Sequence, residues 1–538
     1  MAYRRLLSIF VIISLCAITL IVRTANIADG SLYAKASSYS TSRTLKVSAE
    51  SARGNIYDCN MIILNNTDIV KNAVILPTQQ SVDMTAKYAV DYEKYYADAI
   101  MGKPFCAEIS YGDFFCDSVH VFDIAAQNDS NRLLTHILGY CDDSTEGVCG
   151  LEYAFNDTLK AYSLENSVTY LVDGNGSVIP GEKEQIILNE STVGGIVTTI
   201  DAQFQLICIE AAKGHIEKGA IVVMDIASGD IKAMASFPTY SYDEIETVMY
   251  DESSPMINRA LYSYSVGSIF KLVIAAAAID SGLENFVYEC KGYTSVGSQI
   301  FKCHDIGGHG EQNMTQALVN SCNPYFIELS SKIDAQTLRS YALAFGFGKR
   351  IELAKSINSA SGTLPETSEL EIPAEKANFS FGQGYLTATP LQICTMTCGI
   401  AAYGEMPQPR LYLGTTDDGI SIDVENNTSY SYCASISTAR KLRDFMDAVV
   451  NDNEGSNARA FNTSCGVKTS TAQTGRYDEN GKEYCHGWIT GYFPSQKPRY
   501  AVTVLVEDGG YGNEAAAPVF RYIAEEITSL EKLRTNEE

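Results

Sequence analysis

The chain has 538 residues, 46% of them hydrophobic and 20% charged, which is enough for more than one domain with a sizeable core. Its 65 acidic residues outnumber its 40 basic ones, and the formal net charge is -25 at pH 7. This balance argues against a nucleic-acid partner, because a phosphate backbone requires a basic surface.

The first residues carry a signal for the membrane. Arg4 and Arg5 precede the uncharged run 6–22, and Arg23 closes it. The run is at the short end for a membrane-spanning helix, and the arginines before it favour a cytoplasmic N-terminus. A cleaved signal peptide is the alternative, but no convincing small-residue cleavage site follows. We therefore predict a cytoplasmic tail (1–5), a single-pass anchor (6–22) and an extracytoplasmic remainder.

Residues 23–196 show a mixed pattern. Two β-rich runs within 168–181 flank "DGNG", which is a strong signal for a hairpin turn. The region is predicted to form an elongated, β-rich pedestal domain, comparable to a dimerisation domain.

The pattern changes near residue 197. Asp201 is a plausible N-cap for a helix, and residues 220–238 form two apolar runs around a Ser228–Gly229 turn. A long and mainly helical middle follows. Three strand-like runs and an amphipathic helix close the region, at 465–473, 486–494, 499–508 and 515–533. This order predicts an α+β domain over 197–533, with helices on the faces of an antiparallel sheet, and a short tail at 534–538.

The chain has 15 cysteines, and none has the C-x-x-C spacing of a zinc site. Outside the cell they could form disulfides; alternatively they are buried thiols, and the sequence leaves both open. His304 and His309 lie near Cys303, but neighbouring glycines favour a structural loop there over a metal site. We therefore predict no metal and no cofactor. The candidate disulfide pairs are Cys106 with Cys116, Cys141 with Cys149, Cys290 with Cys303, and Cys465 with Cys485.

Three short motifs occur in order in the second region. They are Ser268-Ile-Phe-Lys271, Ser321-Cys-Asn323 and Lys468-Thr-Ser470. The first motif alone is explained by an N-cap serine and a lysine that reaches the surface. Together, S-x-x-K, S-x-N and a near K-T-G in this order are the signature of penicillin-binding proteins and serine β-lactamases.

Further stretches resemble the class B penicillin-binding proteins, of the penicillin-binding protein 2 or cell-division transpeptidase type. "GSIFK" resembles their P-G-S-T-F-K, and "FSFGQGYLTATPLQ" resembles their S-x-G-Q-G-x-x-x-T-P-L-Q segment. The chain is identified as a member of this family, and the likeness extends to the anchor and pedestal. The other stretches that carry it are "RGNIYD" (53–58), "GLEYAFNDTL" (150–159) and "GGHGEQNMTQALVNSCNPYF" (307–326).

The chemistry of a serine peptidyl transferase explains the first motif. A serine hydroxyl is a poor nucleophile until a base takes its proton, and Ser268 and Lys271 share one face of a helix. Burial of Lys271, with Lys468 nearby, would lower its pKa and let it act as the base. We expect Ser321 to relay the proton to the leaving amine and Asn323 to bind the substrate amide.

The rest of the site is assigned to the third motif. Lys468 and Thr469 are expected to bind the terminal carboxylate of a D-Ala-D-Ala stem peptide, and the resemblance implies an oxyanion hole from the backbone N–H groups of Ser268 and Thr471. Ser470 replaces the glycine of the motif, where a side chain could crowd the substrate or turn away from it.

The resemblance implies a peptidoglycan D,D-transpeptidase of the bacterial cell membrane that binds β-lactams. It also implies a membrane lipid-II glycosyltransferase as partner. A catalytically impaired scaffold, and a D,D-carboxypeptidase or β-lactam hydrolase, are the alternatives. The sequence leaves open whether the protein serves elongation, division or sporulation.

Overall fold

The computed structural model describes residues 2–28, 44–110, 116–126, 134–142, 145–173, 177–189, 193–425, 428–453 and 455–536. The chain forms two compact units that interleave along the sequence. The first comprises Met1–Ala52, Ile69–Ala126 and Ser163–Thr192, and the second comprises Arg53–Asp68, Gln127–Tyr162 and Val193–Glu538. The sequence predicts a single boundary between residues 196 and 197, and these domain limits stay a prediction.

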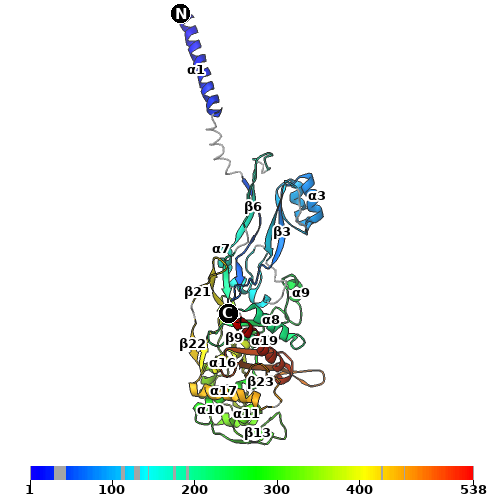
Figure 1. Ribbon diagram of the computed structural model, residues 1–538, viewed down its shortest axis with the longest axis vertical. Coiled ribbons are helices and arrows are strands. Elements are labelled where there is room, and N and C mark those ends of the chain that lie inside the picture. Colours follow the sequence, from blue (N-terminus) through cyan, green and yellow to red (C-terminus); the bar gives the residue numbers. More distant parts are fainter. Residues whose placement is uncertain are drawn as a thin grey trace. The chain divides into compact units, whose positions relative to one another are not determined.

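The helix α1 (Ala2–Ala28) contains the predicted span 6–22 (Figure 1). Within the part of the chain that the structure describes, no helix meets the combined requirements of length and hydropathy for crossing a membrane.

The first unit contains two three-stranded sheets, with the orders β1-β6-β7 and β4-β3-β5. Side chains of β1, β3, β5 and β6 share one buried cluster, so these strands share a core. The predicted hairpin within 168–181 is confirmed by the bonds from Asp173 N–H to Ser177 O (2.8 Å) and from Ile179 N–H to Leu171 O (2.9 Å). The tip of its turn (174–176) lies outside the described residues. The elements are β1 (Thr44–Ala52), β3 (Asp68–Ile75), α3 (Gln79–Tyr88), α4 (Tyr92–Met101), β4 (Phe105–Ile109), β5 (Val119–Ala126), β6 (Leu164–Leu171) and β7 (Gln185–Ile187).

The second unit is built on a five-stranded antiparallel sheet with the order β10-β9-β25-β24-β23. The predicted hairpin and the three late strands are therefore confirmed, and the two ends of this region supply neighbouring strands. β23 is an edge strand, which leaves one side of its backbone available to other groups. The strands are β9 (Gly219–Asp225), β10 (Ile231–Phe237), β23 (Gly466–Tyr477), β24 (Glu483–Phe493) and β25 (Tyr500–Val506).

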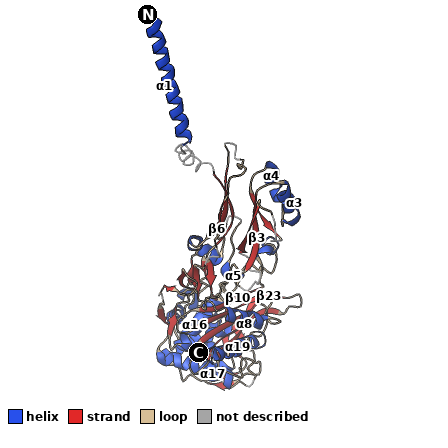
Figure 2. Cartoon of the chain, turned by 45° about the horizontal axis from the view of Figure 1, so that its top comes forward, coloured by secondary structure: helices blue, strands red, loops and turns tan. Residues whose placement is uncertain are grey.

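Helices cover both faces of this sheet. Alternate residues of β9 belong to two different cores: Ile221 and Val223 pack with α8 and α19, whereas Val222 and Met224 pack with the helical middle. Asp201 caps α8 as predicted, because its carboxylate accepts from the N–H groups of Gln203 and Phe204. Figure 2 shows β10 and β23 in red beside the blue helices α8, α16 and α19. These helices are α8 (Ala202–Ala212), α16 (Pro390–Ala401) and α19 (Ala517–Asn536).

A smaller sheet, β2-β8-β20-β21, joins early and late segments of the second unit. Arg53 and Glu152, both buried, form an ion pair with 3.1 Å between Nε and Oε2. The stretches 53–58 and 150–159, which resemble the pedestal of the family, therefore lie within the second unit. The elements are β2 (Asn55–Tyr57), α5 (Thr135–Leu138), α6 (Gly150–Ala154), α7 (Asn156–Ala161), β8 (Gly195–Thr198), β20 (Tyr412–Thr416) and β21 (Asp423–Val424).

The helical middle carries the predicted site. Its centre is α10 (Lys271–Asp280), whose first eight residues are all buried. The remaining elements that surround it are η1 (Tyr242–Glu244), α9 (Ile245–Val248), β11 (Tyr264–Ser265), η2 (Gly267–Phe270), β12 (Tyr288–Cys290), β13 (Tyr293–Val296), β14 (Gln299–Lys302), β15 (Gly310–Gln312), α11 (Met314–Val319), α12 (Asn323–Ser331), α13 (Ala335–Ala344), β16 (Glu352–Ala354), β17 (Ile357–Asn358), α14 (Thr367–Leu370), α15 (Pro373–Ser380), β18 (Thr387–Ala388), β19 (Glu405–Pro407), β22 (Tyr430–Tyr432), α17 (Ile436–Asn451) and α18 (Gly512–Ala515).

Candidate active site

A glycine sets up the turn that carries the predicted nucleophile. Gly267 has φ +63°, and it begins the short 3-10 helix η2, which leads from β11 into α10. This left-handed conformation favours glycine, and a Cβ at this position would also lie 2.4 Å from Ser470 Oγ. Ser268 therefore follows a tight turn, half-exposed, at the start of a buried helix.

Lys271 lies one turn further along and is completely buried. Its Nζ lies 3.0 Å from Ser268 Oγ, 2.7 Å from Ser321 O and 2.6 Å from Asn323 Oδ1. Burial, reinforced by the positive charge of Lys468, holds the pKa of Lys271 well below its usual value. Two N–H groups of a neutral amine can bond the two carbonyl oxygens. The lone pair is then left facing the hydroxyl of Ser268.

The second motif lies between two helices. α11 ends with the bonds from Ser321 N–H to Leu318 O (3.2 Å) and from Cys322 N–H to Ala317 O (2.9 Å). These are the two bonds of a Schellman cap, and they place Ser321 in the left-handed region, at φ +50°. Cys322 is then the N-cap of α12, and Asn323 is its first residue. The compact junction brings Ser321 and Asn323 to the same amine of Lys271.

Lys468 approaches from the edge strand β23 and is 1% exposed. Its Nζ donates to Thr469 O at 2.9 Å and lies 3.5 Å from Ser321 Oγ. Burial lowers the pKa of Lys468 to about 7. Thr469 and Thr471 alternate with the buried residues of the strand and are half-exposed.

Ser470 turns its side chain toward the backbone of the nucleophile turn. Its Oγ donates a hydrogen bond of 2.8 Å to Val266 O, and the residue is 3% exposed. The hydroxyl is thus bonded to the chain just before Gly267 and Ser268. The adjacent stretch 379–384 supports the same turn, because Gly267 N–H donates to Gly382 O at 2.8 Å.

The structure therefore brings the predicted catalytic residues Ser268, Lys271, Ser321 and Asn323 together, with Lys468 beside them. Thr469 and Thr471 lie on the same strand edge. The roles of all these residues, and the oxyanion hole, stay predictions.

The sequence predicts no metal beside Cys303 and His309, and it gives no signal that Cys322 lies with them. Cys290, Cys303, His309 and Cys322 place their ligand atoms within 4.8 Å of one another. We call these four residues the thiol cluster. They follow one another as C-x12-C-x5-H-x12-C, which matches no short zinc motif, so only the fold brings them together. Each of the 15 cysteines is a free thiol, so the structure contains none of the candidate disulfides.

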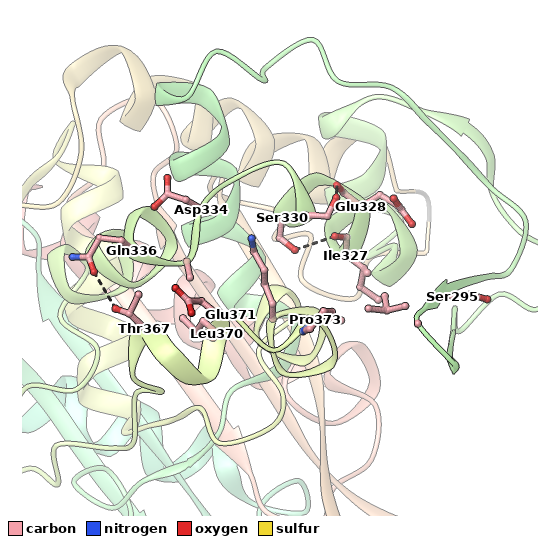
Figure 3. A pocket seen from close by; sticks show the side chains of 16 residues that line it. Ser295, Ile327, Glu328, Ser330, Asp334, Gln336, Thr367, Leu370, Glu371 and Pro373 are labelled. Atoms are coloured by element: carbon pink, nitrogen blue, oxygen red, sulfur yellow. Dashed lines mark hydrogen bonds between the residues drawn. The ribbon is translucent and has the colours of Figure 1, made fainter.

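A cavity of about 680 Å³ lies on another side of α12 (Figure 3). Ile327, Glu328 and Ser330 line it from α12, and Thr367 donates to Gln336 Oε1 at 3.0 Å on its far side. None of the predicted catalytic or substrate-binding residues lines it. This cavity is therefore separate from the group around Ser268.

Comparison with known proteins yields one family match, to the penicillin binding protein transpeptidase domain, over residues 219–525. Stage V sporulation protein D of Bacillus subtilis is 27% identical over 406 residues, which cover 72% of this chain and 61% of that protein. The peptidoglycan D,D-transpeptidase MrdA of Haemophilus influenzae is 26% identical over 434 residues, covering 73% of this chain and 65% of that protein. The chain thus matches less than two thirds of the length of each relative.

Solved structures show the same fold. Penicillin-Binding Protein (PBP2) from Helicobacter pylori superposes with a TM-score of 0.69 at 20% identity, covering 90% of this chain and 99% of that one. The penicillin G acyl-enzyme complex of penicillin-binding protein A from M. tuberculosis gives a TM-score of 0.65 at 20% identity, covering 89% of this chain and all of that one. The predicted α+β fold with an antiparallel sheet flanked by helices is therefore confirmed for the second unit.

Proposed function

Because this chain belongs to the penicillin-binding protein transpeptidase family, we propose that it is a serine D,D-transpeptidase that cross-links peptidoglycan stem peptides. One observation carries the proposal: Nζ of Lys271 lies 3.0 Å from Ser268 Oγ, in a buried site that holds its pKa well below the usual value. A neutral amine at that distance can accept the hydroxyl proton. Ser268 is then the nucleophile and Lys271 its general base.

Acylation proceeds in two bond changes. Lys271 takes the proton as Ser268 Oγ bonds to the carbonyl carbon of the penultimate D-alanine, and the N–H groups of Ser268 and Thr471 stabilise the oxyanion. The C–N bond then breaks, and the terminal D-alanine leaves after its amine receives the proton through Ser321. An amino group of a second stem peptide then attacks the ester carbonyl. The C–O bond to Ser268 breaks, and a proton of that amine passes through Lys271 to Ser268 Oγ.

The remaining side chains orient the donor peptide. Asn323 Oδ1 accepts from Lys271, which leaves its Nδ2 to donate to a substrate carbonyl. Lys468 and Thr469 lie on the edge strand, where an extended peptide can add as a further strand. Their ammonium and hydroxyl groups suit the terminal carboxylate of the peptide and the carboxylate of a β-lactam.

The impaired scaffold is the second candidate, because Ser470 replaces the motif glycine. The bond from Ser470 Oγ to Val266 O favours an active enzyme, since the hydroxyl is directed to backbone and not toward Thr469 and Thr471. A D,D-carboxypeptidase or β-lactam hydrolase would use the same acyl-enzyme but pass it to water. The three candidates differ in the fate of the acyl group on Ser268.

We also propose that residues 6–22 anchor the protein in the bacterial cell membrane, with the second unit extracytoplasmic. Phe10 and Leu20 of α1 are each 70% exposed, as expected of side chains that face lipid. A membrane lipid-II glycosyltransferase is the proposed partner. Co-purification of that enzyme with the full chain, and its loss when residues 1–23 are removed, tests both proposals.

The catalytic proposal is tested by labelling the full chain, in detergent, with a fluorescent penicillin and mapping the labelled peptide. We expect one stable adduct, on Ser268, that is absent from Ser268→Ala. The acyl group from a D-Ala-D-Ala donor should then pass to an added amine acceptor. An unlabelled native protein supports the scaffold, and release of the acyl group to water alone supports a hydrolase.

A further inference from the structure

The thiol cluster draws its side chains from four places in the second unit. Cys290 ends β12, Cys303 follows β14, and His309 precedes β15, while Cys322 caps α12. Cys290 pairs with Gly310 across β12 and β15. His309 is the residue before Gly310, so this pairing places Cys290 beside His309. The three cysteines are buried and His309 is partly exposed. The fold thus gathers three thiols and one imidazole in a place with little access to water.

The donor set and spacing fit one soft metal ion. Three cysteines and a histidine form one of the ligand sets of structural zinc, with Zn–S near 2.3 Å and Zn–N near 2.0 Å. In a tetrahedron of that size, a sulfur and a nitrogen lie about 3.5 Å apart. Cys303 Sγ and His309 Nδ1 lie 3.5 Å apart. A disulfide between any two of the cysteines would need about 2.05 Å and would leave the third thiol and the imidazole unused.

We propose that Cys290, Cys303, His309 and Cys322 bind one zinc ion. Four protein ligands complete the tetrahedron, so the site is closed and structural, with no position left for substrate. Binding requires the thiols to lose their protons to solvent, and it changes no oxidation state.

The ion braces the active site through Cys322. This residue stands between Ser321 and Asn323, whose side chains both contact Lys271. Ser321 holds a left-handed conformation that a residue with a Cβ adopts at a cost, and it is fixed there by the cap of α11 on one side and by Cys322 on the other. Cys322 is therefore a positioning residue: its sulfur, once bound to zinc, fixes the backbone of the motif.

Metal content of the full chain tests the proposal without reference to activity. We expect about one zinc per chain in protein purified without added metal. His309→Ala should weaken zinc binding tenfold or more, measured by competition with a chromogenic chelator, whereas His304→Ala should weaken it less. His304 is the control for a contact that is not a ligand, because its Nδ1 lies 3.9 Å from Cys303 Sγ but the residue lies outside the cluster. Cobalt reconstitution should give the visible spectrum of a tetrahedral thiolate site.

The proposal can still be tested if a variant fails to fold, because a second measurement uses only the native chain. Mass spectrometry of an unreduced digest distinguishes zinc thiolates from a bridge. A Cys290–Cys303 disulfide in the native protein would overturn the proposal, as would native protein without zinc that also fails to take up cobalt. These measurements do not involve penicillin. The zinc proposal can therefore be overturned while Ser268 is still labelled, and zinc can be present in a protein that penicillin does not label.

A different observation carries a second inference, about Ser470. Its hydroxyl is bonded at 2.8 Å to Val266 O and occupies the space where Gly267 has no side chain. This bond links the substrate-binding strand β23 to the turn of the nucleophile. We infer that Ser470 is a positioning residue that holds the two elements in register and does not contact substrate.

The affinity and the acylation rate of a penicillin separate this role from crowding of the substrate. Ser470→Ala and Ser470→Gly should each lower the acylation rate of Ser268 at saturation about fivefold, because one hydrogen bond is lost, with the dissociation constant unchanged. Ser470→Thr, which keeps a hydroxyl, should retain more of the rate than Ser470→Ala. Tighter binding by Ser470→Gly with an unchanged rate would overturn the inference.

Discussion

The segment Ser321-Cys322-Asn323 borders two buried polar groups of different character. On one side, Ser321 and Asn323 contact Lys271, and Lys468 lies close by. On the other, Cys322 joins two further thiols and an imidazole. In the proposed mechanism the lysine side keeps Asn323 Nδ2 for a substrate and the lone pair of Lys271 for the proton of Ser268. The thiol side has a complete set of four ligands and nothing left to offer a substrate.

This difference suggests two roles: the group around Lys271 takes part in the reaction, and the thiol cluster stabilises the backbone beside it. A catalytic base must be able to gain and lose a proton, and the burial, lowered pKa and two carbonyl partners of Lys271 suit this proposed role. A brace must not change during the reaction, and a closed metal site meets that need. The variants and conditions below act on one side at a time.

The largest effect is expected from Lys271→Gln. Loss of the general base should lower the acylation rate of Ser268 by about 10²- to 10⁴-fold, since that is the usual contribution of proton transfer. Zinc content should not change, because Lys271 is not a ligand of the thiol cluster. The measurement is the rate of labelling by fluorescent penicillin.

Lys376→Gln is the matched control. Lys376 is partly buried and, like Lys271, donates to a backbone carbonyl, here of Ile333, and burial lowers its pKa too. It lines the cavity beside α12, which Ser268 does not line. An equal loss of labelling in the two variants would mean that Lys271 acts through stability and not as a base.

The two sides also differ in how far the sequence predicts them. Ser268 and Lys271 are three residues apart, and Ser321 and Asn323 two apart, because a helical turn or cap sets each pair; short motifs therefore reveal them. The strands 465–473, 486–494 and 499–508 were likewise readable from their apolar runs. The four ligands of the thiol cluster are separated by 12, 5 and 12 residues. The pairing of β12 with β15 brings Cys290 beside His309, and tertiary packing adds Cys303 and Cys322.

Other features depend on long-range packing and were beyond local patterns. The first unit is interrupted twice along the sequence. The two interrupting segments, 53–68 and 127–162, belong to the second unit. The buried pair of Arg53 and Glu152 shows why: each charge requires a partner about 100 positions away. The direction of the Ser470 side chain likewise depends on Val266, across the boundary between strand and helix.

The second effect is a pH dependence of β-lactam affinity. Burial lowers the pKa of Lys468 to about 7, so the free protein loses this charge as the pH rises above 7. If a ligand carboxylate binds only the ammonium form of Lys468, binding requires Lys468 to take up a proton from solvent. The dissociation constant of the ligand should then rise about tenfold per pH unit between pH 7 and 9. Titrating the affinity of a non-acylating carboxylate ligand across this range measures it.

Unfolding does not account for such a loss. The unfolded chain binds more protons at Lys468 than the folded chain between about pH 7 and the usual pKa of lysine, so this group makes stability rise with pH there. The variant Lys468→Arg, whose guanidinium stays charged, should bind with little dependence on pH. A flat profile in the native protein would show that Lys468 does not titrate in this range.

A smaller effect is expected from removing zinc. Chelation acts on the thiol side alone, and it should lower the acylation rate about tenfold and reduce the thermal midpoint, because Ser321 and Asn323 lose their brace. Zinc should restore both, and magnesium should restore neither, since thiolates select soft ions. Acylation that is unaffected by complete removal of the metal would separate the two sides altogether.

The smallest effect concerns the residue that both sides share. Ser321 has φ +50°, where a Cβ costs about 1 kcal/mol that glycine avoids. Ser321→Ala and Ser321→Gly both remove the hydroxyl near Lys271 and Lys468, so both should slow acylation alike. They differ in the backbone: Ser321→Gly should have the higher thermal midpoint, by the equivalent of about 0.5 kcal/mol, since the greater entropy of unfolded glycine offsets part of the relief. Equal midpoints would mean that the cap of α11 holds the left-handed conformation without strain, and that zinc at Cys322 is not needed to keep Ser321 in place.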